Sequence, residues 1–545
     1  MDFQRLFLFL IFSLSVFLLW DGWQRAQHPV VQAVPVTAPS AASAPVIATT
    51  GADRPSANAV VAQQKHLAGQ KITVKTDWLV AEINTVGGDL CHLEFLQHRD
   101  AQDKSKPFVL LQEQKARTYI AQTGLLGTGL PTHNAVFIAQ DNEYQLVEGR
   151  DTLEVRLLAT EIAVAKVTKV YVFHRGSYVI DVGYEIENSG TAPLSSSAYF
   201  QFVRDKTPPE GGSKFVPTYT GPAVYTEQEK FQKVGFSDID KGKIKYLQST
   251  DNGWVGMLQH YFVAAWLPKD KTQREFYTKQ LEENLYSAGI ILPMETISPG
   301  QSAKISVPLY AGPAQVSLNK VAPGLGLTVD YGWLTIIATP LFWLLSFLQG
   351  WVHNWGVAII LLTVLIKLAF FPLSAASYRS MGKMRVVAPK LEKIKQQYSD
   401  DRERLHKAMM ELYKAEKINP LGGCLPVLIQ IPVFISLYWA ILASVELRYA
   451  PFFGWISDLS AADPYYVLPL IMGASMLLQS KLNPVPPDPL QAKLMQIMPI
   501  VFSVVFFFFP AGLVLYSIVN NSLSIVQQWY ISRGLVAEAK GVAKA

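Results

Sequence analysis

Long stretches without any charged side chain dominate the second half of this chain. No Asp, Glu, Lys or Arg occurs in residues 331–366, 418–445, 464–480 or 494–532. A helix needs about 20 apolar residues to cross the hydrocarbon core of a bilayer. With the apolar run near the start, these stretches predict spanning helices at 6–20, about 356–376, 422–442, 464–481, 495–509 and 512–530. The pattern therefore predicts a polytopic α-helical membrane protein with six transmembrane helices.

The first half follows a different pattern, in which apolar and polar residues alternate. Segments such as KITVKTDWLVAEINT, TLEVRLLAT and AKISVPLYAG are rich in Val, Ile and Thr, and clusters of Gly, Pro, Asn and Asp separate them. Alternation with a period of two is typical of strands that bury one face. We expect one large all-β domain over residues 71–325 rather than several small domains.

The residues before this domain form two segments. In residues 1–26 an apolar stretch runs from Leu6 to Trp20. A cleavable signal peptide has an apolar core of about 7–15 residues and a cleavage site of small residues, but Asp21 and Trp23 occupy that place. An uncleaved signal-anchor helix is therefore favoured. Residues 27–70, rich in Ala, Pro and Ser, are predicted to be a flexible tether.

Residues 331–354 resemble a further spanning helix in hydropathy alone. Their few polar residues, however, recur at spacings that form one narrow stripe on a helix. These polar residues are Thr335, Thr339, Ser346, Gln349 and His353. Because tryptophans such as Trp343 and Trp351 favour the membrane–water interface, we expect residues 326–354 to contain an amphipathic helix lying in the interface.

The distribution of positive charge predicts how the helices are oriented. Residues 375–419 contain 11 Lys and Arg against 6 Asp and Glu, so this segment carries the same net charge, +5, as the whole chain. Residues 446–463 contain one Arg and three acidic residues. Short loops rich in Lys and Arg stay in the cytoplasm. Six spans then place both termini and 375–419 in the cytoplasm and the β-domain outside, whereas a seventh span at 331–354 would put the basic segment on the wrong side.

Composition excludes several classes of protein. Hydrophobic residues make up 50% of the chain and charged residues 17%, below the quarter or so found in soluble domains, so the chain is neither wholly soluble nor disordered. Its two cysteines, Cys91 and Cys424, are predicted on opposite sides of the membrane and cannot form a disulfide framework. Because no nucleotide-binding, metalloprotease or hydrolase motif is present, we expect no enzymatic activity, no cofactor and no metal.

Lys367 is the exceptional residue of the predicted helices. It follows Trp355 by 12 residues, which places it about 18 Å along a helix, a little past the middle of the bilayer. A lysine near that depth costs about 2.5–3.5 kcal/mol, so it should face protein or water rather than lipid. A lysine that extends its side chain to the cytoplasmic interface is the alternative, and both interpretations remain open here.

Other polar residues of the predicted helices could share an aqueous pocket with Lys367. They are Thr363, Gln430, Tyr516, Ser517, Asn520 and Asn521. Each alone is more typical of helix packing than of a site. Together they predict a hydrophilic cavity within the bilayer that opens toward the cytoplasm.

The basic segment 375–419 is predicted to be a helical hairpin. Apolar residues recur in steps of three and four on both arms, for example Met384, Val387 and Leu391 on the first arm and Leu405 and Met409 on the second. Residues 399–401 form the turn and supply N-cap side chains. The charge of the hairpin can be a solvated face that anchors the topology, or it can contact ribosomal RNA, a targeting protein or anionic headgroups.

Three segments carry a family resemblance. KAEKINPLGGCLPVLIQIPVFISLYWAILASVELR, DPYYVLPLIMG and FPAGLVLYSIVNN resemble, in sequence, order and spacing, the YidC/Oxa/Alb family of membrane protein insertases. The anchor followed by a large β-domain is similar to the Gram-negative bacterial type of this family. The resemblance implies a five-helix insertase core over 355–533, a cytoplasmic tail at 534–545, and a periplasmic β-supersandwich similar to sugar-mutarotase folds.

The resemblance also implies a function and a site. It implies an insertase and chaperone of the bacterial inner membrane, acting alone or with the Sec translocon through a hydrophilic groove open to cytoplasm and lipid. The family usually has arginine in the groove where this chain has Lys367, so charge is kept but bidentate pairing is lost. Thr363, Gln430 and Tyr516 match groove or substrate-contact positions.

The implied partners are nascent integral membrane proteins, the Sec translocon, membrane lipids, and the ribosome and signal-recognition machinery at the hairpin and tail, but not DNA. Two other classes of function are weighed against this one. A small-solute transporter or channel would show inverted repeats, and none is evident. A membrane-anchored periplasmic carbohydrate-binding protein would leave five helices and Lys367 without a role.

Overall fold

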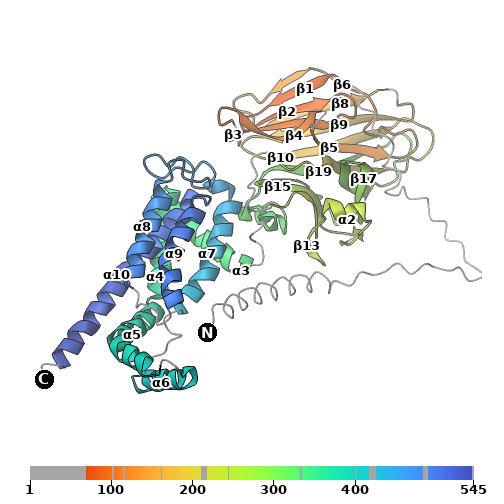
Figure 1. The fold of residues 1–545 in the computed structure, drawn as a ribbon. Coiled ribbons are helices and arrows are strands. Elements are labelled where there is room, and N and C mark those ends of the chain that lie inside the picture. Colours follow the sequence, from red (N-terminus) through yellow and green to blue (C-terminus); the bar gives the residue numbers. More distant parts are fainter. Residues whose placement is uncertain are drawn as a thin grey trace, which may run out of the picture.

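The structure, a computed structural model, describes residues 69–542 except for 101–102, 115–116, 161, 210–217, 244, 330, 332–333, 399–400, 417–424 and 483–488. The predicted signal anchor at 1–26, nearly all of the tether at 27–70, Cys424 and most of the hairpin turn lie outside the described residues, as do the side chains of the tail at 534–545. Figure 1 shows the chain in two parts, a layered β-domain from the first half and a group of helices from the second.

The β-domain consists of two large sheets, one of ten strands and one of nine. Neighbouring strands are antiparallel, except that β1 and β7 are parallel. The ten-stranded sheet contains, in spatial order, β14 (Ser249–Thr250), β17 (Arg274–Glu282), β18 (Leu285–Pro293), β11 (Ser197–Asp205), β5 (Arg117–Leu126), β4 (Pro107–Gln114), β3 (Leu90–Arg99), β2 (Leu79–Asn84), β1 (Lys71–Lys75) and β7 (Glu143–Gln145). The nine-stranded sheet contains β13 (Lys230–Lys233), β12 (Gly221–Thr226), β15 (Trp254–Gln259), β16 (Phe262–Trp266), β19 (Ser302–Pro313), β10 (Val179–Asn188), β9 (Ala165–His174), β8 (Thr152–Ala159) and β6 (Phe137–Ala139).

The alternation that predicted these strands is visible in their burial. In β9, every second residue from Ala165 to Phe173 is buried, as expected for a strand with one face in the core. Strands such as β12, β15 and β16 are instead buried on both faces. Their second face is covered by other parts of the chain, which a strand's own sequence does not reveal. The prediction of one large all-β domain is confirmed.

A second apolar core covers the outer face of the nine-stranded sheet and continues into the helices. It contains Trp254 and Val263 of the sheet, Leu325 of the segment after the last strand, and Leu437 and Ile441 of a helix. Two short 3₁₀ helices, η2 (Val316–Lys320) and η3 (Leu325–Thr328), form the connecting segment, and the Trp254 indole donates to Pro323 O at 2.9 Å. The β-domain and the helical part are therefore packed together rather than merely tethered.

The remaining elements are helices. Within the β-domain lies the short α2 (Phe236–Asp240). The helical part contains α3 (Thr335–Val352), α4 (Trp355–Ala369), α5 (Phe371–Gln397), α6 (Arg402–Ala415), α7 (Leu425–Ala443), the 3₁₀ helix η6 (Val445–Leu447), α8 (Val467–Leu482), α9 (Pro489–Phe506) and α10 (Ala511–Val542). In the hairpin region, Val387 and Leu391 of α5 pack against Tyr413 of α6, and the Asp401 carboxylate accepts hydrogen bonds from the backbone N–H groups of Glu403 and Arg404.

One predicted helix is broken. The apolar pattern predicted a continuous helix over about 356–376, but α4 ends at Ala369 and α5 leaves at an angle of 66°. Pro372 stands in the first turn of α5. A proline is well tolerated at the start of a helix but lacks the N–H needed in its interior, which explains why the helix restarts here.

The helices differ in their ability to cross a bilayer. Among the described residues, one helix, Thr335–Val352, is long and apolar enough by itself, and a second span is counted if α4 and the first part of α5 are taken as one bent span. Shorter apolar helices occur at Ile429–Ala443, Val467–Leu482 and Gln496–Phe506. The predicted number of six spans, and the interfacial position of α3, thus remain predictions.

The segment after α7 is anchored on the β-domain through Arg448. Its guanidinium lies 5.5 Å from the ring centres of Phe108 and Tyr261 and 5.9 Å from that of Phe262. The adjacent Tyr449 hydroxyl donates to Asp100 O at 2.5 Å. Each cation–π contact contributes on the order of 0.5–2 kcal/mol, so Arg448 fixes this segment to the two sheets.

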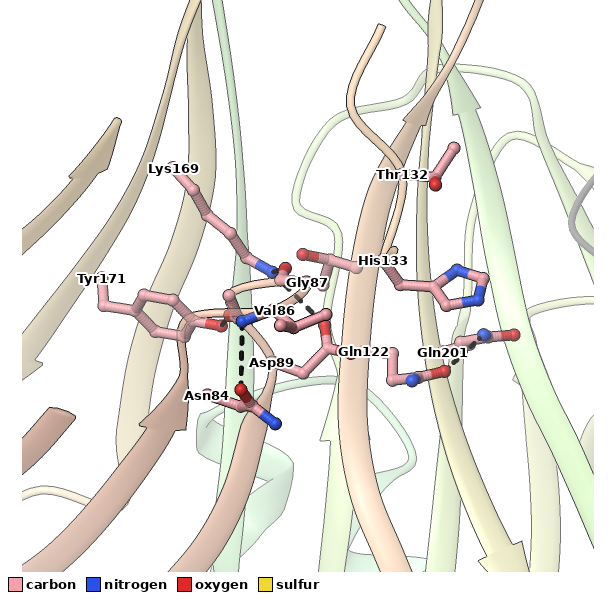
Figure 2. Close-up of polar contacts among 12 residues, drawn as sticks. Asn84, Val86, Gly87, Asp89, Gln122, Thr132, His133, Lys169, Tyr171 and Gln201 are labelled. Carbon is pink, nitrogen blue, oxygen red and sulfur yellow. Dashed lines mark hydrogen bonds and ion pairs between the residues drawn. The ribbon is translucent and has the colours of Figure 1, made fainter. Parts of the chain in front are cut away.

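A buried ion pair links the two sheets. Lys169 occupies an inward position of β9, and Figure 2 shows its side chain extending toward the turn that carries Gly87 and Asp89. The Lys169 Nζ donates to Gly87 O at 3.0 Å and lies 3.6 Å from Asp89 Oδ1. Burial raises the pKa of Asp89 to about 7, although Lys169 opposes this shift, and burial lowers the pKa of Lys169 to about 8. Each charge is therefore tolerated in the core mainly because of the other.

Removing one member of this pair should destabilise the β-domain strongly. Lys169→Met keeps the length of the side chain but leaves Asp89 buried without a cation, at an expected cost of about 3–5 kcal/mol. The double variant Asp89→Asn/Lys169→Met should recover most of that loss, because no uncompensated charge remains. Thermal unfolding of the detergent-solubilised protein, followed by circular dichroism, measures both. Additive losses in the double variant would contradict the pairing.

The same variant should show a defined pH dependence. Burial raises the pKa of Asp89 above its ordinary value of 3.8 and Lys169 opposes this rise, so in Lys169→Met the pKa of Asp89 is raised further. The stability gained from the protonated form is present at low pH and is lost as the pH rises through this raised pKa. The defect of Lys169→Met should therefore shrink as the pH is lowered from about 8 to about 5. A defect that grows over this range would contradict the assignment.

Candidate functional site

A cavity of about 300 Å³ lies in the helical part, where the junction of α4 and α5 faces α7, α8, α9 and α10. Most of its wall is apolar, with Ile366, Phe434, Met472 and Phe506 among the lining residues. Its polar lining comes from Lys367, Ser374, Gln430, Gln479 and a row of residues on α10. The cavity is therefore a polar pocket inside an otherwise apolar group of helices.

Four of the five predicted site residues line this cavity. They are Lys367, Gln430, Tyr516 and Asn520, which come from α4, α7 and α10. Thr363 is fully buried but is not among the lining residues, and its hydroxyl donates to Ile359 O of its own helix at 2.6 Å. Ser517 and Asn521 also line the cavity.

Lys367 is held inside the cavity rather than in water. Its residue is 8% exposed, and its Nζ donates to Ser524 Oγ at 2.6 Å. Among the residues that the structure describes, no carboxylate forms an ion pair with it. The structure thus favours a lysine that faces a polar cavity over one that extends to the interface, and its positive charge is not cancelled by a neighbour.

The other polar groups of the cavity are only partly paired. The Gln430 amide donates to the Tyr516 hydroxyl, which joins α7 to α10. The Asn521 amide donates to Ser475 Oγ of α8 at 2.8 Å. Asn520 Oδ1 is buried without a hydrogen-bond partner among the described residues. Buried polar atoms are rarely left unpaired in proteins, so this oxygen is available to an occupant of the cavity.

Sequence reasoning missed Ser524, the residue that contacts Lys367. A signal was present, because Tyr516, Asn520 and Ser524 follow one another at intervals of four and so lie on one face of a helix. A serine in an apolar helix usually bonds to its own backbone, so its position alone does not indicate a site. Ser524 does this as well, donating to Asn520 O at 2.8 Å.

At the start of α10, the loop between η6 and α8 covers the helices. The first N–H groups of α10 find partners there: Ala511 N donates to Ala461 O at 2.7 Å and Gly512 N donates to Leu459 O at 2.9 Å. Asp463 is 1% exposed and accepts from Trp455 Nε1 at 2.9 Å and from Leu468 N at 2.7 Å. This loop closes one end of the helical part through hydrogen bonds that the helix starts require.

The described residues contain no group of three or more His, Cys, Asp or Glu side chains that could hold a metal ion. The chemistry of the cavity is therefore that of one ammonium group, amides, hydroxyls and apolar walls. Such a pocket can hold an occupant with both polar and apolar parts, and its lining comes from the helical part alone. These features define a helical membrane protein with a polar internal pocket and a large β-domain.

Comparison with known proteins assigns the family. Residues 71–344 match the family described as the YidC periplasmic domain, and residues 347–538 match the family described as the 60Kd inner membrane protein. A membrane protein insertase YidC of Nitrosospira multiformis is 56% identical over 564 residues, covering 100% of this chain and 99% of that protein. One from Methylobacillus flagellatus is 55% identical over 554 residues, covering 100% of both. A crystal structure of an active YidC insertase with its first transmembrane domain resolved is 19% identical, with a TM-score of 0.39, and covers 86% of this chain and 94% of that one.

The chain belongs to the YidC family of membrane protein insertases. It is an insertase of the inner membrane and not an enzyme, and its substrates are nascent membrane proteins. The comparisons do not favour the transporter or the carbohydrate-binding alternative.

Removing the Asp463 carboxylate should loosen the loop that closes the helical part. Asp463→Ala leaves the Trp455 indole, the buried Leu468 amide and the partly buried Tyr465 amide without their acceptor, which costs about 2–3 kcal/mol. Hydrogen exchange measured by mass spectrometry should show faster exchange at the Ala511 and Gly512 amides. Asp458→Ala is the matched control, since Asp458 lies in the same loop but bonds only to Ser460. Equal exchange in the two variants would contradict the role given to Asp463.

Proposed function

We propose that this insertase receives the polar flank of a nascent membrane protein in the cavity around Lys367 and releases the adjoining apolar segment sideways into lipid, between α7 and α10. The observation that carries the proposal is the buried lysine, which faces a polar-lined cavity and lacks an ion-pair partner in the described part of the chain. The cavity then acts as a groove open to cytoplasm and lipid.

The uncancelled charge of Lys367 selects what enters the cavity. In surroundings of low dielectric constant, a positive charge attracts a carboxylate far more strongly than it does in water. Acidic and polar flanks are therefore held longer than neutral ones. Because the charge is an ammonium and not a guanidinium, the attraction is that of a compact point charge without a bidentate fork.

The energy for insertion comes from the substrate and the membrane. Transfer of an apolar segment from water to lipid releases about 25 cal/mol per Å² of apolar surface. The membrane potential adds about 2.3 kcal/mol per 100 mV for each negative charge that moves outward. The polar cavity shortens the dehydrated path of the flank, so no nucleotide is required.

We place both termini in the cytoplasm and the β-domain in the periplasm, with six spans. The basic segment 375–419 supports this orientation because Lys- and Arg-rich loops stay inside. On α3, Trp343, Phe347 and Trp351 are 67%, 48% and 75% exposed and their rings form one row of neighbouring contacts. Such an aromatic row suits a helix that lies in the interface beside the β-domain.

The cytoplasmic hairpin and tail are proposed to meet partners during insertion. Lys383, Lys390 and Lys393 of α5 are exposed, while the apolar residues of the hairpin pack between its arms. An exposed basic face suits ribosomal RNA, signal-recognition machinery and anionic lipid headgroups. The Sec translocon is proposed as a partner for larger substrates, as the family resemblance implies.

Changing the charge at position 367 should change insertion selectively. In proteoliposomes, Lys367→Ala should lower insertion of a substrate with an acidic extracytoplasmic tail about tenfold, equivalent to about 1.4 kcal/mol, and Lys367→Glu should lower it further. A matched substrate with a neutral tail should be affected less. Lys304→Ala, at an exposed lysine of the β-domain, serves as the control. Unchanged insertion by both Lys367 variants would contradict the proposal, and solute flux through the purified protein would favour a transporter.

The predicted topology can be tested with two single cysteines in a chain whose Cys91 and Cys424 are replaced. Lys304 of β19 and Lys390 of α5 have side chains that are 74% and 64% exposed. If α3 lies in the interface, one span separates these positions, and an impermeant thiol reagent should label Lys304→Cys from the periplasm and Lys390→Cys from the cytoplasm only. Labelling of both positions from the same side would show that α3 crosses the membrane.

A further inference from the structure

We propose that Ser524 is a positioning residue for substrate binding, which holds the Lys367 ammonium at the cavity wall without cancelling its charge, so that a substrate carboxylate can replace it. This inference rests on the role proposed above for Lys367. It adds a second residue, from a helix distant in sequence, that determines where the charge is located.

The contact joins two helices that are far apart along the chain. Lys367 lies near the end of α4, Ser524 lies in α10, and both line the cavity. The Nζ to Oγ distance is 2.6 Å, and the two residues are 8% and 5% exposed. Among the described contacts, this is the one hydrogen bond that directs the ammonium into the cavity.

The hydrogen bonds of Ser524 have a fixed direction. An ammonium group has three donors and no acceptor, so Ser524 Oγ must accept from Lys367. The hydroxyl proton of Ser524 is then donated to Asn520 O at 2.8 Å, and Tyr378 of α5 forms a further side-chain hydrogen bond with Ser524. Because the Ser524 proton is directed to the helix backbone, the lone pairs of Oγ remain for Nζ and for the Tyr378 hydroxyl.

A hydroxyl oxygen is suited to binding the Lys367 ammonium until a substrate carboxylate replaces it. A carboxylate in this place would form an ion pair and cancel the charge, whereas a neutral oxygen leaves the full positive charge in the cavity. An arriving carboxylate brings Coulomb attraction that the hydroxyl lacks, so the exchange favours the substrate. Asn520 Oδ1, which is buried one turn away and has no hydrogen-bond partner within the described part of the chain, can accept a backbone N–H of the same substrate segment.

Without Ser524, the Lys367 ammonium can be solvated at the membrane interface instead of in the cavity. A long lysine side chain near the end of a membrane helix extends toward the interface, and Lys367 stands two residues before the end of α4. Loss of the acceptor would let Nζ leave the cavity, and the capture of acidic flanks would fall. A compact ammonium can pivot between two acceptors by rotation of its terminal bonds, which a planar guanidinium does less readily.

The experiment compares variants of α10 in proteoliposomes of the full-length protein, with a pair of substrates that differ only in having an acidic or a neutral extracytoplasmic tail. Ser524→Ala should lower the acidic-to-neutral insertion ratio about fivefold or more, as expected for the loss of a hydrogen bond to a charged group. Ser524→Thr, which keeps the hydroxyl, should retain the ratio. Ser524→Asp, which supplies a carboxylate, should abolish the preference for acidic tails.

Ser522→Ala is the matched control. Ser522 lies on the same helix two residues from Ser524, is exposed and is not among the lining residues of the cavity. Its removal should leave the ratio unchanged. In a Lys367→Met background, Ser524→Ala should have no further effect on the ratio, because its target is gone.

The outcomes separate this inference from the proposed function. If Lys367→Met loses the ratio while Ser524→Ala behaves like Ser522→Ala, the inference on Ser524 is overturned and the role of Lys367 stands. Equal loss of both substrates in Ser524→Ala, with an unchanged ratio, also overturns it, since that is the effect of a structural serine. An unchanged ratio in Lys367→Met overturns both proposals.

Discussion

The cost of placing one ammonium group among apolar helices governs how the helical part of this protein is built. Lys367 can be buried only where polar atoms surround it, and the structure supplies them from α10, which carries Tyr516, Asn520 and Ser524 on one face. The same helix begins at the loop between η6 and α8, and its first N–H groups donate to the carbonyl groups of Ala461 and Leu459. One helix therefore both solvates the charge and binds, at its start, the loop that closes one end of the helical part.

The β-domain is packed against one of the helices that line the cavity. The apolar core that covers the outer face of the nine-stranded sheet continues through η3 into α7, and Arg448 binds the segment after α7 to aromatic rings of the two sheets. Within the domain, the Asp89–Lys169 pair joins the sheets to each other. The β-domain is thus packed against the C-terminal part of α7, the helix that also contributes Gln430 to the cavity, and this limits how far that helix can tilt.

Much of this arrangement follows from sequence pattern. Strand alternation revealed the β-domain, and polar residues in uncharged runs identified Lys367, Gln430, Tyr516 and Asn520, which the structure brings to one cavity. Thr363 shows the limit of that reasoning, because a hydroxyl in a helix can satisfy itself at the preceding turn, as it does with Ile359. The contact between Lys367 and Ser524 spans 157 residues, and the second buried face of β15 and β16 depends on distant segments. Such features come from tertiary packing, which local periodicity does not encode.

The break between α4 and α5 connects the hairpin to the cavity. The 27 residues of α5, with Pro389 in the helix interior, extend over about 40 Å. The first turns of α5 are packed against other helices, because Ala375, Ser377 and Tyr378 are buried, and Tyr378 lines the cavity. A displacement of the hairpin is therefore passed along α5 to the wall of the cavity.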